Sequence, residues 1–346
     1  MINRIGILFG VGCLAALYAG SAGAQEDPAY MKQLYDKAVS SGQKTITVYS
    51  PFPGMPGWLD EFSASYPEIK VVHQVLGAAQ MTTRLEAERT SGNHAGDIGI
   101  SGLILLGPLN DQGFFEAYQP KSSAGLDPNL RTSDGNVSIP FINLFALDYN
   151  TQLVSESDLP KSFAELFSGK WKGQIGYSNM ANSGASEMCG TLLWKNGRLT
   201  REDLQGLKDN GVGFKANTEV SVNLAQGRVS FGLWSPSHST KRVKRDGAPV
   251  DVGYVRDMAC TFGAGAGLIK DAPNPDAAKL LLEWLFSAEG QKAATGPFSA
   301  YGTMPGAGKP EGYPDISDLN LTPIKPAELA KDLADFRKIT QEIWTN

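Results

Sequence analysis

The stretch TITVYSPFPGMPGWLDEFSASYPEIKVV, residues 45–72, decides the fold of this chain. Its first five residues, TITVY, are β-branched or aromatic and predict a strand. A turn rich in proline and glycine follows over residues 50–57, and an amphipathic helix then ends at Pro67. Residues 70–75 predict the next strand. A strand, a helix and a strand in this order indicate parallel strands covered by helices.

The same alternation continues along the chain. Residues 79–90 predict a helix, and residues 97–100 predict a short strand. The apolar run INLFALDY, residues 142–149, predicts a strand long enough to cross between two lobes. Residues 250–269 predict a second crossing segment, and a last helix is expected over about residues 327–344. The fold class is therefore α/β.

Two helix starts in the middle section are predicted from capping residues. Ser162 and Glu165 have the spacing of a capping box, in which each side chain bonds the backbone N–H of the other residue. Thr218 predicts the cap of a short helix that ends at Gly227.

The N-terminus predicts a secretory signal peptide over residues 1–24. Arg4 supplies a basic start, residues 5–19 carry no charge, and Ala22-Gly23-Ala24 is a small-residue exit. The apolar run is shorter than the ~20 residues that span a bilayer. We therefore expect export to the periplasm, with a mature chain that begins at Gln25.

Composition and charge narrow the class of protein. After cleavage about 320 residues remain, more than one core usually supports, so two domains are expected. Apolar residues make up 42% and charged residues 19%, as in ordinary globular proteins. A net charge of -5 and an isoelectric point near 5.4 argue against nucleic acid or an anionic membrane as the partner.

Cysteine and histidine are sparse. Cys13 leaves with the predicted signal peptide, so Cys189 and Cys260 remain. They can pair in an oxidising compartment, but their spacing does not show whether they lie close enough, and both outcomes stay open. The three histidines (His73, His94 and His238) have no metal-ligand spacing, so no metal site and no cofactor are expected.

Catalytic motifs are weak. The glycine-rich residues 263–267 precede an apolar segment and a turn rather than a helix, unlike a dinucleotide loop. No Gly-x-Ser-x-Gly elbow is present. A secreted hydrolase that uses His238 near Ser235 or Ser237 stays as an alternative class, although we expect a protein that is not an enzyme.

Five loops that follow predicted strands are the candidate ligand-binding positions. In open α/β sheets, ligands bind at the carboxyl ends of strands, where helix N-termini present free N–H groups. The five loops are small or hydroxyl-bearing, and two of them add an aromatic residue. They are SPF (50–52), GAAQ (77–80), SG (101–102), NSG (182–184) and WSPS (234–237).

The order of short motifs along the chain resembles the extracellular solute-binding proteins of bacterial ABC importers, in the iron(III)/thiamine/phosphonate-type branch. The resemblance covers nearly the whole predicted mature chain. The motifs are ITVYS (46–50), LEAE (85–88), GDI (96–98), LDYNT (147–151), DLPKSF (158–163), KWKG (170–173), GAPV (247–250), APNP (272–275) and LFSAEGQ (285–291).

The resemblance implies a two-lobed periplasmic binding protein type 2 fold. Two mixed or parallel sheets with flanking helices would be joined by two crossing strands. Lobe 1 would comprise residues 25–141 and 262–346, and lobe 2 residues 142–261. The implied partners are a small-molecule ligand and an inner-membrane ABC permease, and a monomer is expected. A sensory role for the same closed form is a further alternative.

The resemblance also places site residues. At the cleft it puts Ser50, Ala79, Ser101, Asn182, Ser183, Trp234 and Ser235, and on the second crossing segment Asp257. The five loops named above add Phe52 and Gln80. The iron-binding members have a histidine after the first strand and a tyrosine pair after the strand that ends near Trp234. This sequence has SPF and WSP there, which puts direct iron binding in doubt.

The expected ligand is an organic anion. Hydroxyls, helix N-termini and the nearby Arg256, Lys241 and Arg242 suit a phosphonate, a phosphate ester or a carboxylate. The basic residues can equally lie on a solvated helix face. A cationic solute of the thiamine or polyamine type, held by Asp257 and Trp234, is the alternative ligand.

Overall fold

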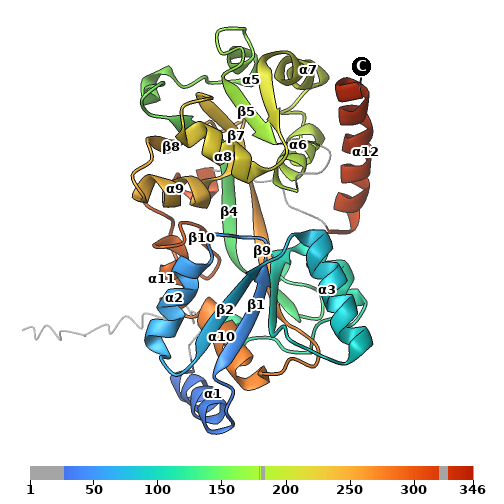
Figure 1. Ribbon diagram of the computed structural model, residues 1–346, viewed down its shortest axis with the longest axis vertical. Helices are drawn as coiled ribbons and strands as arrows, with labels where there is room; N and C mark the ends of the chain where they lie inside the picture. The colour runs from blue at the N-terminus through green and yellow to red at the C-terminus, as the bar shows by residue number, and fades with distance from the viewer. Residues whose placement is uncertain (1–26, 179, 181–183, 319–325, 346) are drawn as a thin grey trace, which may run out of the picture.

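The computed structural model describes residues 27–178, 180, 184–318 and 326–345. The predicted signal peptide therefore lies outside the described residues. Two α/β lobes lie one above the other along the long axis, and the long strands β4 and β9 run between them (Figure 1). Among the described residues, no helix is both long and apolar enough to span a bilayer.

The strands form one hydrogen-bonded path in the order β2-β1-β3-β9-β4-β7-β5-β6, with β8 and β10 paired to β4. The predicted crossing strands β4 and β9 pair with each other, so they join the two expected sheets into one. The predicted second crossing segment divides into β8 and β9. The strands are β1 (Thr45–Ser50), β2 (Lys70–Val75), β3 (Ile98–Gly102), β4 (Val137–Asn150), β5 (Ile175–Ser178), β6 (Gly211–Phe214), β7 (Phe231–Pro236), β8 (Val250–Gly253), β9 (Cys260–Leu268) and β10 (Tyr301–Gly302).

Strand direction brings the functional ends of the two lobes together. In lobe 1, β1 is parallel to β2 and β3, and β3 is antiparallel to β9. In lobe 2, β5 is parallel to β6 and β7, and β7 is antiparallel to β4. Because β4 and β9 are antiparallel, the carboxyl ends of β1–β3 point toward lobe 2 and those of β5–β7 point toward lobe 1.

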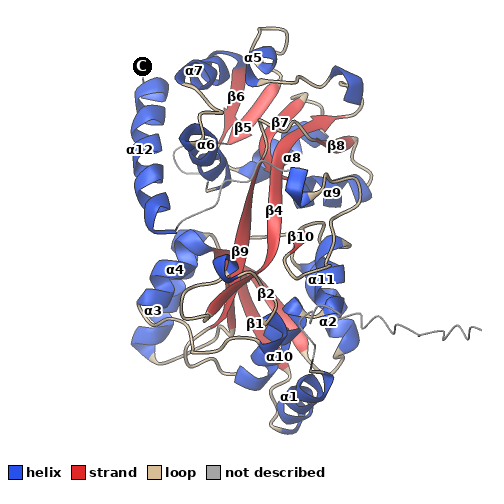
Figure 2. Cartoon of the chain, turned by 180° about the vertical axis from the view of Figure 1, so that it is seen from behind, coloured by secondary structure: helices blue, strands red, loops and turns tan. Residues whose placement is uncertain are grey.

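Helices cover both faces of the sheet in each lobe (Figure 2). In lobe 1 they are α1 (Pro28–Ser40), α2 (Pro56–Ser65), α3 (Ala78–Ser91), α4 (Leu103–Asp111), α10 (Pro275–Phe286) and α11 (Ala288–Thr295). In lobe 2 they are α5 (Phe163–Leu166), α6 (Ala185–Lys195), α7 (Arg201–Asn210), α8 (Asn217–Ala225) and α9 (Ser237–Arg245). The last helix is α12 (Pro326–Thr345).

Each lobe has its own apolar core. The lobe 1 core is built on large aromatic residues such as Trp58, Phe141 and Trp284, taken from residues 31–141 and 264–304. The lobe 2 core takes most of its residues from 145–260. The predicted lobe boundaries remain a proposal, which these two cores support except for α12 and for the segment around Tyr313, which packs on lobe 2 residues such as Leu144 and Ala259.

Helix α12 differs from the expected assignment to lobe 1, because it packs on lobe 2. Phe336 and Ile343 belong to the lobe 2 core, and Arg337 makes an ion pair with Glu187 of α6. Gly190 permits the close approach, since a Cβ there would lie 2.5 Å from the Phe336 ring. The absence of a side chain at Gly190 therefore makes room for Phe336, which lies 146 positions further along the chain.

Three local expectations have a clear outcome. Cys189 and Cys260, left open by the sequence, form a disulfide that ties α6 to the start of β9. Half of the predicted capping box forms: Ser162 caps α5 by accepting from the Glu165 N–H at 3.2 Å, whereas the Glu165 carboxylate accepts from the Lys161 N–H at 2.9 Å. The prediction for Thr218 is wrong: α8 begins at Asn217 after Ala216, so Thr218 lies inside the helix.

Candidate functional site

The candidate site is the junction, defined here as the region where the carboxyl ends of β1–β3 meet those of β5–β7. Helices α2, α3 and α4 start there in lobe 1, and α6, α8 and α9 start there in lobe 2. Ligands of open α/β sheets bind at such ends, because the first N–H groups of a helix have no partner within the helix. The topology therefore directs six helix starts toward one region.

Helix starts at the junction differ from those elsewhere. Side chains cap α1, α5, α7 and α11, which begin away from the junction; the capping residues are Asp27, Ser162, Thr200 and Ser287. All six junction helices have no side-chain cap; the residues before α2, α3, α4, α6, α8 and α9 are Met55, Gly77, Gly102, Gly184, Ala216 and Pro236. Helix α10, which begins at a proline, is also uncapped. Uncapped starts at the junction leave N–H groups for water or an anionic ligand.

A small polar cluster in lobe 2 joins the end of one strand to the starts of two helices. Ser178, the last residue of β5, bonds both Ser186 of α6 and Asn217, the first residue of α8. The Ser178–Asn217 distance is 2.6 Å between Oγ and Oδ1. The cluster holds the starts of α6 and α8 beside each other. None of the three residues was predicted, although a serine at a strand end is a signal that could have found Ser178.

Trp234 is placed differently from the predicted cleft wall. It is the bulge residue where the pairing of β4 and β7 shifts register, and its φ of 56° is unusual for a bulky side chain. Its side chain is fully buried in the lobe 2 core, where the indole N–H donates to the Met258 carbonyl at 2.8 Å. The contacts of Trp234 are those of a core residue.

His238, in the first turn of α9, packs between the lobes. Its ring lies 5.0 Å from the Phe298 ring and 6.1 Å from the Phe52 ring, both in lobe 1. Burial, with a smaller effect of Arg242, lowers the pKa of His238 to about 3. The imidazole is therefore neutral, and its Nδ1 has no hydrogen-bond partner in the described structure.

Ser50, at the end of β1, is buried with its hydroxyl already engaged. Its Oγ lies 2.7 Å from His73 Nε2 and 3.2 Å from Met55 Sδ. Burial lowers the pKa of His73. Phe52 is partly buried and packs on Phe141 with ring centroids 5.7 Å apart. His73 was not predicted here, because its contact with Ser50 depends on strand pairing rather than on sequence distance.

The remaining predicted residues are spread around the junction. Ala79 and Gln80 are exposed in the first turn of α3, where the Gln80 amide oxygen accepts from the Gly77 N–H at 3.0 Å. Ser101 is buried in β3 opposite Gly265 of β9. Asp257 is exposed between β8 and β9. Asn182 and Ser183 lie outside the described residues.

The basic residues expected near the ligand have other partners or lie on the surface. Lys241 makes an ion pair with Asp251 at 3.0 Å, and Arg242 lies 3.7 Å from Asp246. Arg256 is exposed, and its carbonyl accepts from Arg198 at 3.4 Å. Of the two alternatives for the basic residues, a solvated helix face therefore describes Lys241 and Arg242 of α9 better than a ligand contact does.

Asn143, on the crossing strand β4, is not among the predicted site residues. It is buried, and neither its amide oxygen nor its amide nitrogen has a hydrogen-bond partner. Alternation along the strand puts it on the same face as Phe141 of the lobe 1 core and Phe145 of the lobe 2 core. An asparagine inside the apolar run 142–149 was a readable signal, because a buried amide needs partners.

Ser235 is a second buried group without a partner. Its Oγ lies at the end of β7, next to Gly232 and the α8 residues Val220 and Leu224, and makes no hydrogen bond. With Asn143 and His238, it forms what we call the unpaired group. All three residues lie on β4 or on the β7–α9 connection, where the lobes meet.

Two further contacts join the lobes. Arg245 of α9 donates to Ser299 Oγ at 2.9 Å and to the Pro297 carbonyl at 2.6 Å, both in lobe 1. On the other side, Ile104 of α4 packs against an apolar cluster on α6 and α12; the cluster is Met188, Leu192, Leu329 and Leu333. Within the described residues, no three His, Cys, Asp or Glu side chains lie close enough together to hold a metal ion.

Two lobes, two crossing strands and helix starts directed at one junction define a class of binding proteins that enclose a ligand between lobes. The model of the family described as bacterial extracellular solute-binding protein matches residues 57–315. The chain belongs to this family, as its motifs predicted.

Individual relatives share about a quarter of their residues with this chain where they align. The chain is 27% identical over 186 residues to the major ferric iron-binding protein of Neisseria meningitidis serogroup B, covering 52% of this chain. It spans about half the length of that relative, 54%. It is 26% identical over 275 residues to a probable ABC transporter periplasmic-binding protein of Sinorhizobium fredii, covering 76% of this chain and 75% of the relative.

Solved structures establish the fold. Iron-bound HitA from Pseudomonas aeruginosa matches with a TM-score of 0.70 at 20% identity, covering 86% of this chain and 99% of that one. The periplasmic binding protein AfuA from Actinobacillus pleuropneumoniae, with fructose-6-phosphate bound, matches with a TM-score of 0.68 at 22% identity, covering 87% and 98%. The predicted two-lobed periplasmic-binding-protein fold is confirmed.

Proposed function

We propose that this protein is a periplasmic receptor that binds one small solute between its lobes and delivers it to an ABC importer, without transforming it. Family membership and the Sinorhizobium relative, a probable ABC transporter periplasmic-binding protein, support the receptor class. Export would use the signal peptide predicted over residues 1–24. Opening and closing of the lobes would occur about β4 and β9, the strands that connect them.

The unpaired group is the observation that carries the proposal. Asn143, Ser235 and His238 are each at most 3% exposed, and each has a polar atom without a hydrogen bond. Leaving a buried polar atom unpaired costs roughly 1–3 kcal/mol. A solute that supplied the missing hydrogen bonds would remove this cost on binding, so the arrangement favours a receptor that is completed by its ligand.

We propose an organic anion as the ligand: a phosphonate, a phosphate ester or a carboxylate. Six uncapped helix starts direct N–H groups and positive dipole ends toward the junction, an arrangement that suits negative charge. The bound fructose-6-phosphate of AfuA is a phosphate ester in a protein of the same fold. We place the ligand against the unpaired group, beside the starts of α6 and α8 that the Ser178 cluster holds together, and remove Trp234 from the predicted contacts.

Ferric iron is the second candidate, because the Neisseria relative is named for it. Iron(III) prefers anionic oxygen ligands. The ring centroids of Tyr301 and Tyr313 lie 5.6 Å apart. Burial raises the pKa of both phenols, however, which opposes the ionisation that iron binding needs. The last residues of β1 and β7 are Ser50 and Trp234–Pro236, none of which offers an anionic oxygen, and this also favours an anion over iron.

A thermal-shift screen of the purified protein would test the proposal. The probes are methylphosphonate, fructose-6-phosphate, citrate, ferric citrate, thiamine and spermidine. A ligand at 100 times its dissociation constant should add about 2.7 kcal/mol of stability, a rise of several degrees in Tm. We expect a shift with one class of anion, followed by a dissociation constant from calorimetry and no chemical change in the ligand.

Other outcomes would count against specific parts of the proposal. A shift with ferric citrate but not with citrate would replace the organic anion with iron. A shift with thiamine or spermidine alone would establish a cation receptor. Turnover of the bound solute that is lost in His238→Ala would replace the receptor with an enzyme.

A further inference from the structure

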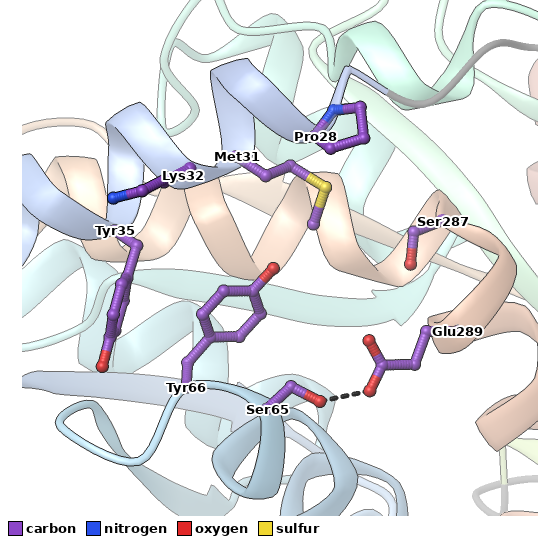
Figure 3. A pocket seen from close by; sticks show the side chains of 8 residues that line it. All are labelled: Pro28, Met31, Lys32, Tyr35, Ser65, Tyr66, Ser287 and Glu289. Atoms are coloured by element: carbon purple, nitrogen blue, oxygen red, sulfur yellow. Dashed lines mark hydrogen bonds between the residues drawn. The ribbon is translucent and has the colours of Figure 1, made fainter.

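Lobe 1 has a cavity of about 240 Å³ far from the junction, between α1, the end of α2 and the start of α11. Figure 3 shows its side chains converging from the three elements. Its walls are mostly apolar or aromatic and include Met31, Tyr35 and Tyr66. The volume is slightly below that of typical ligand pockets, so a small molecule would fill it.

The cavity combines aromatic rings with a carboxylate. Tyr35 and Tyr66 have ring centroids 5.3 Å apart at an angle of 55°. Glu289 of α11 reaches the cavity and accepts a hydrogen bond from Ser65. Within the described residues, Glu289 makes no ion pair, and the lysine at the rim, Lys32, is paired with Asp36 at 2.6 Å.

The same combination holds an ammonium group elsewhere on α1. The Lys121 ammonium lies 3.7 Å from the centroid of the Tyr30 ring and 3.9 Å from Asp27 Oδ2. A tyrosine face and a carboxylate are thus already used by this protein to hold a primary ammonium. The cavity has two tyrosines and a carboxylate, and the lysine that lines it, Lys32, makes its ion pair with Asp36 of the same helix rather than with Glu289.

We propose that this cavity is a second binding site, for a small alkylammonium ion. Its ammonium would face Glu289 and the Tyr66 ring, and its alkyl chain would pack on Met31 and Pro28. Cation–π attraction and a carboxylate favour such a group over a neutral molecule of equal size. The site is independent of the solute at the junction, because no residue of the unpaired group lines it.

Nuclear magnetic resonance titration of the purified protein with n-butylammonium would test the site, with n-butanol as the neutral control. We expect n-butylammonium to shift the signals of Met31 and Tyr66, with a dissociation constant on the order of 10 mM or tighter. Glu289→Gln should weaken binding about tenfold while keeping an acceptor for Ser65. The control is Glu68→Gln, which removes a carboxylate two positions after Tyr66. Glu68 pairs with Lys44 and does not line the cavity, so this change should leave binding unchanged.

Equal shifts with n-butanol would show an apolar groove and overturn the proposal. So would a Glu289→Gln protein that binds n-butylammonium as tightly as the wild type. If Glu289→Gln perturbed the fold, Tyr66→Leu would test the ring contribution instead, and unchanged affinity in a folded Tyr66→Leu protein would again contradict it.

Discussion

The two sides of the junction treat their polar groups differently. On the lobe 1 side, Ser50 is buried and its hydroxyl is engaged by His73 and Met55. On the lobe 2 side and on the crossing strand, Ser235, His238 and Asn143 are equally buried and have polar atoms without partners. The difference teaches that burial alone does not mark a binding residue. A paired group stabilises the fold, whereas an unpaired buried group fits a role in binding.

The largest expected effect is the loss of a core residue that the sequence placed at the ligand. Trp234→Ala should destabilise lobe 2 by about 3–5 kcal/mol, because it removes a fully buried indole and its bond to Met258. Urea denaturation would measure the change. A stable Trp234→Ala protein with weakened ligand binding would return Trp234 to the site and break the distinction between paired and unpaired residues.

The next effect is a pH dependence from His238. The pKa of His238 is about 3 in the folded protein against about 6.5 in the unfolded chain. Below pH 6.5 the unfolded chain binds a proton that the folded protein does not, so the free energy of unfolding is highest above pH 6.5 and falls as the pH drops toward 3. The loss should reach about 2–3 kcal/mol at pH 4.5. Denaturation curves of the wild type and His238→Gln between pH 7 and pH 4.5 would measure it. Parallel curves for the two proteins would contradict this expectation.

Asn143 gives the sharpest test of the unpaired group. Asn143→Leu should lower the affinity for the junction ligand by about ten- to a hundredfold, since it removes hydrogen bonds worth roughly 1–3 kcal/mol. The same change should leave stability equal or higher, because it removes a buried amide that has no partner in the protein. Calorimetry and urea denaturation would measure the two quantities. Lower stability with unchanged affinity would make Asn143 a structural residue.

Two serines offer the smallest and most closely matched comparison. Ser50→Ala should cost about 1 kcal/mol of stability, because it breaks a made hydrogen bond. Ser235→Ala should cost little stability and should instead weaken ligand binding, since its hydroxyl has no partner to lose. Thermal unfolding with and without ligand would compare them. Equal stability losses in both variants would erase the difference between the two sides.

Local patterns predicted much of the fold. The first strand, the apolar run at 142–149 and the last helix were readable, because each depends on the spacing of apolar residues within one segment. The side on which α12 packs was not readable, since it depends on the space left by Gly190. The Cys189–Cys260 disulfide stayed open for the same reason: it joins residues 71 positions apart.

The candidate site was harder to predict. The rule for parallel sheets directed the prediction to the ends of strands, and Ser50, Ser101 and Ser235 lie in the last two residues of β1, β3 and β7. Trp234 was misjudged because a bulge turns its backbone to a φ of 56° and its ring into the core, and no sequence pattern marks that bulge. Asn143 lies inside an apolar run on the crossing strand, and the rule for strand ends does not cover a residue in the middle of a strand.

The way the chain passes between the lobes also governs when it can fold. The lobe 1 core needs Phe298 and Met304 beside residues that precede 141, and the lobe 2 core needs Phe336 and Ile343 beside α6. The lobe 1 core therefore needs synthesis to pass Met304, and the lobe 2 core needs the last helix. Contacts between such distant segments slow folding. Each lobe can therefore complete its core only late in synthesis, which would suit a chain that is exported before it folds.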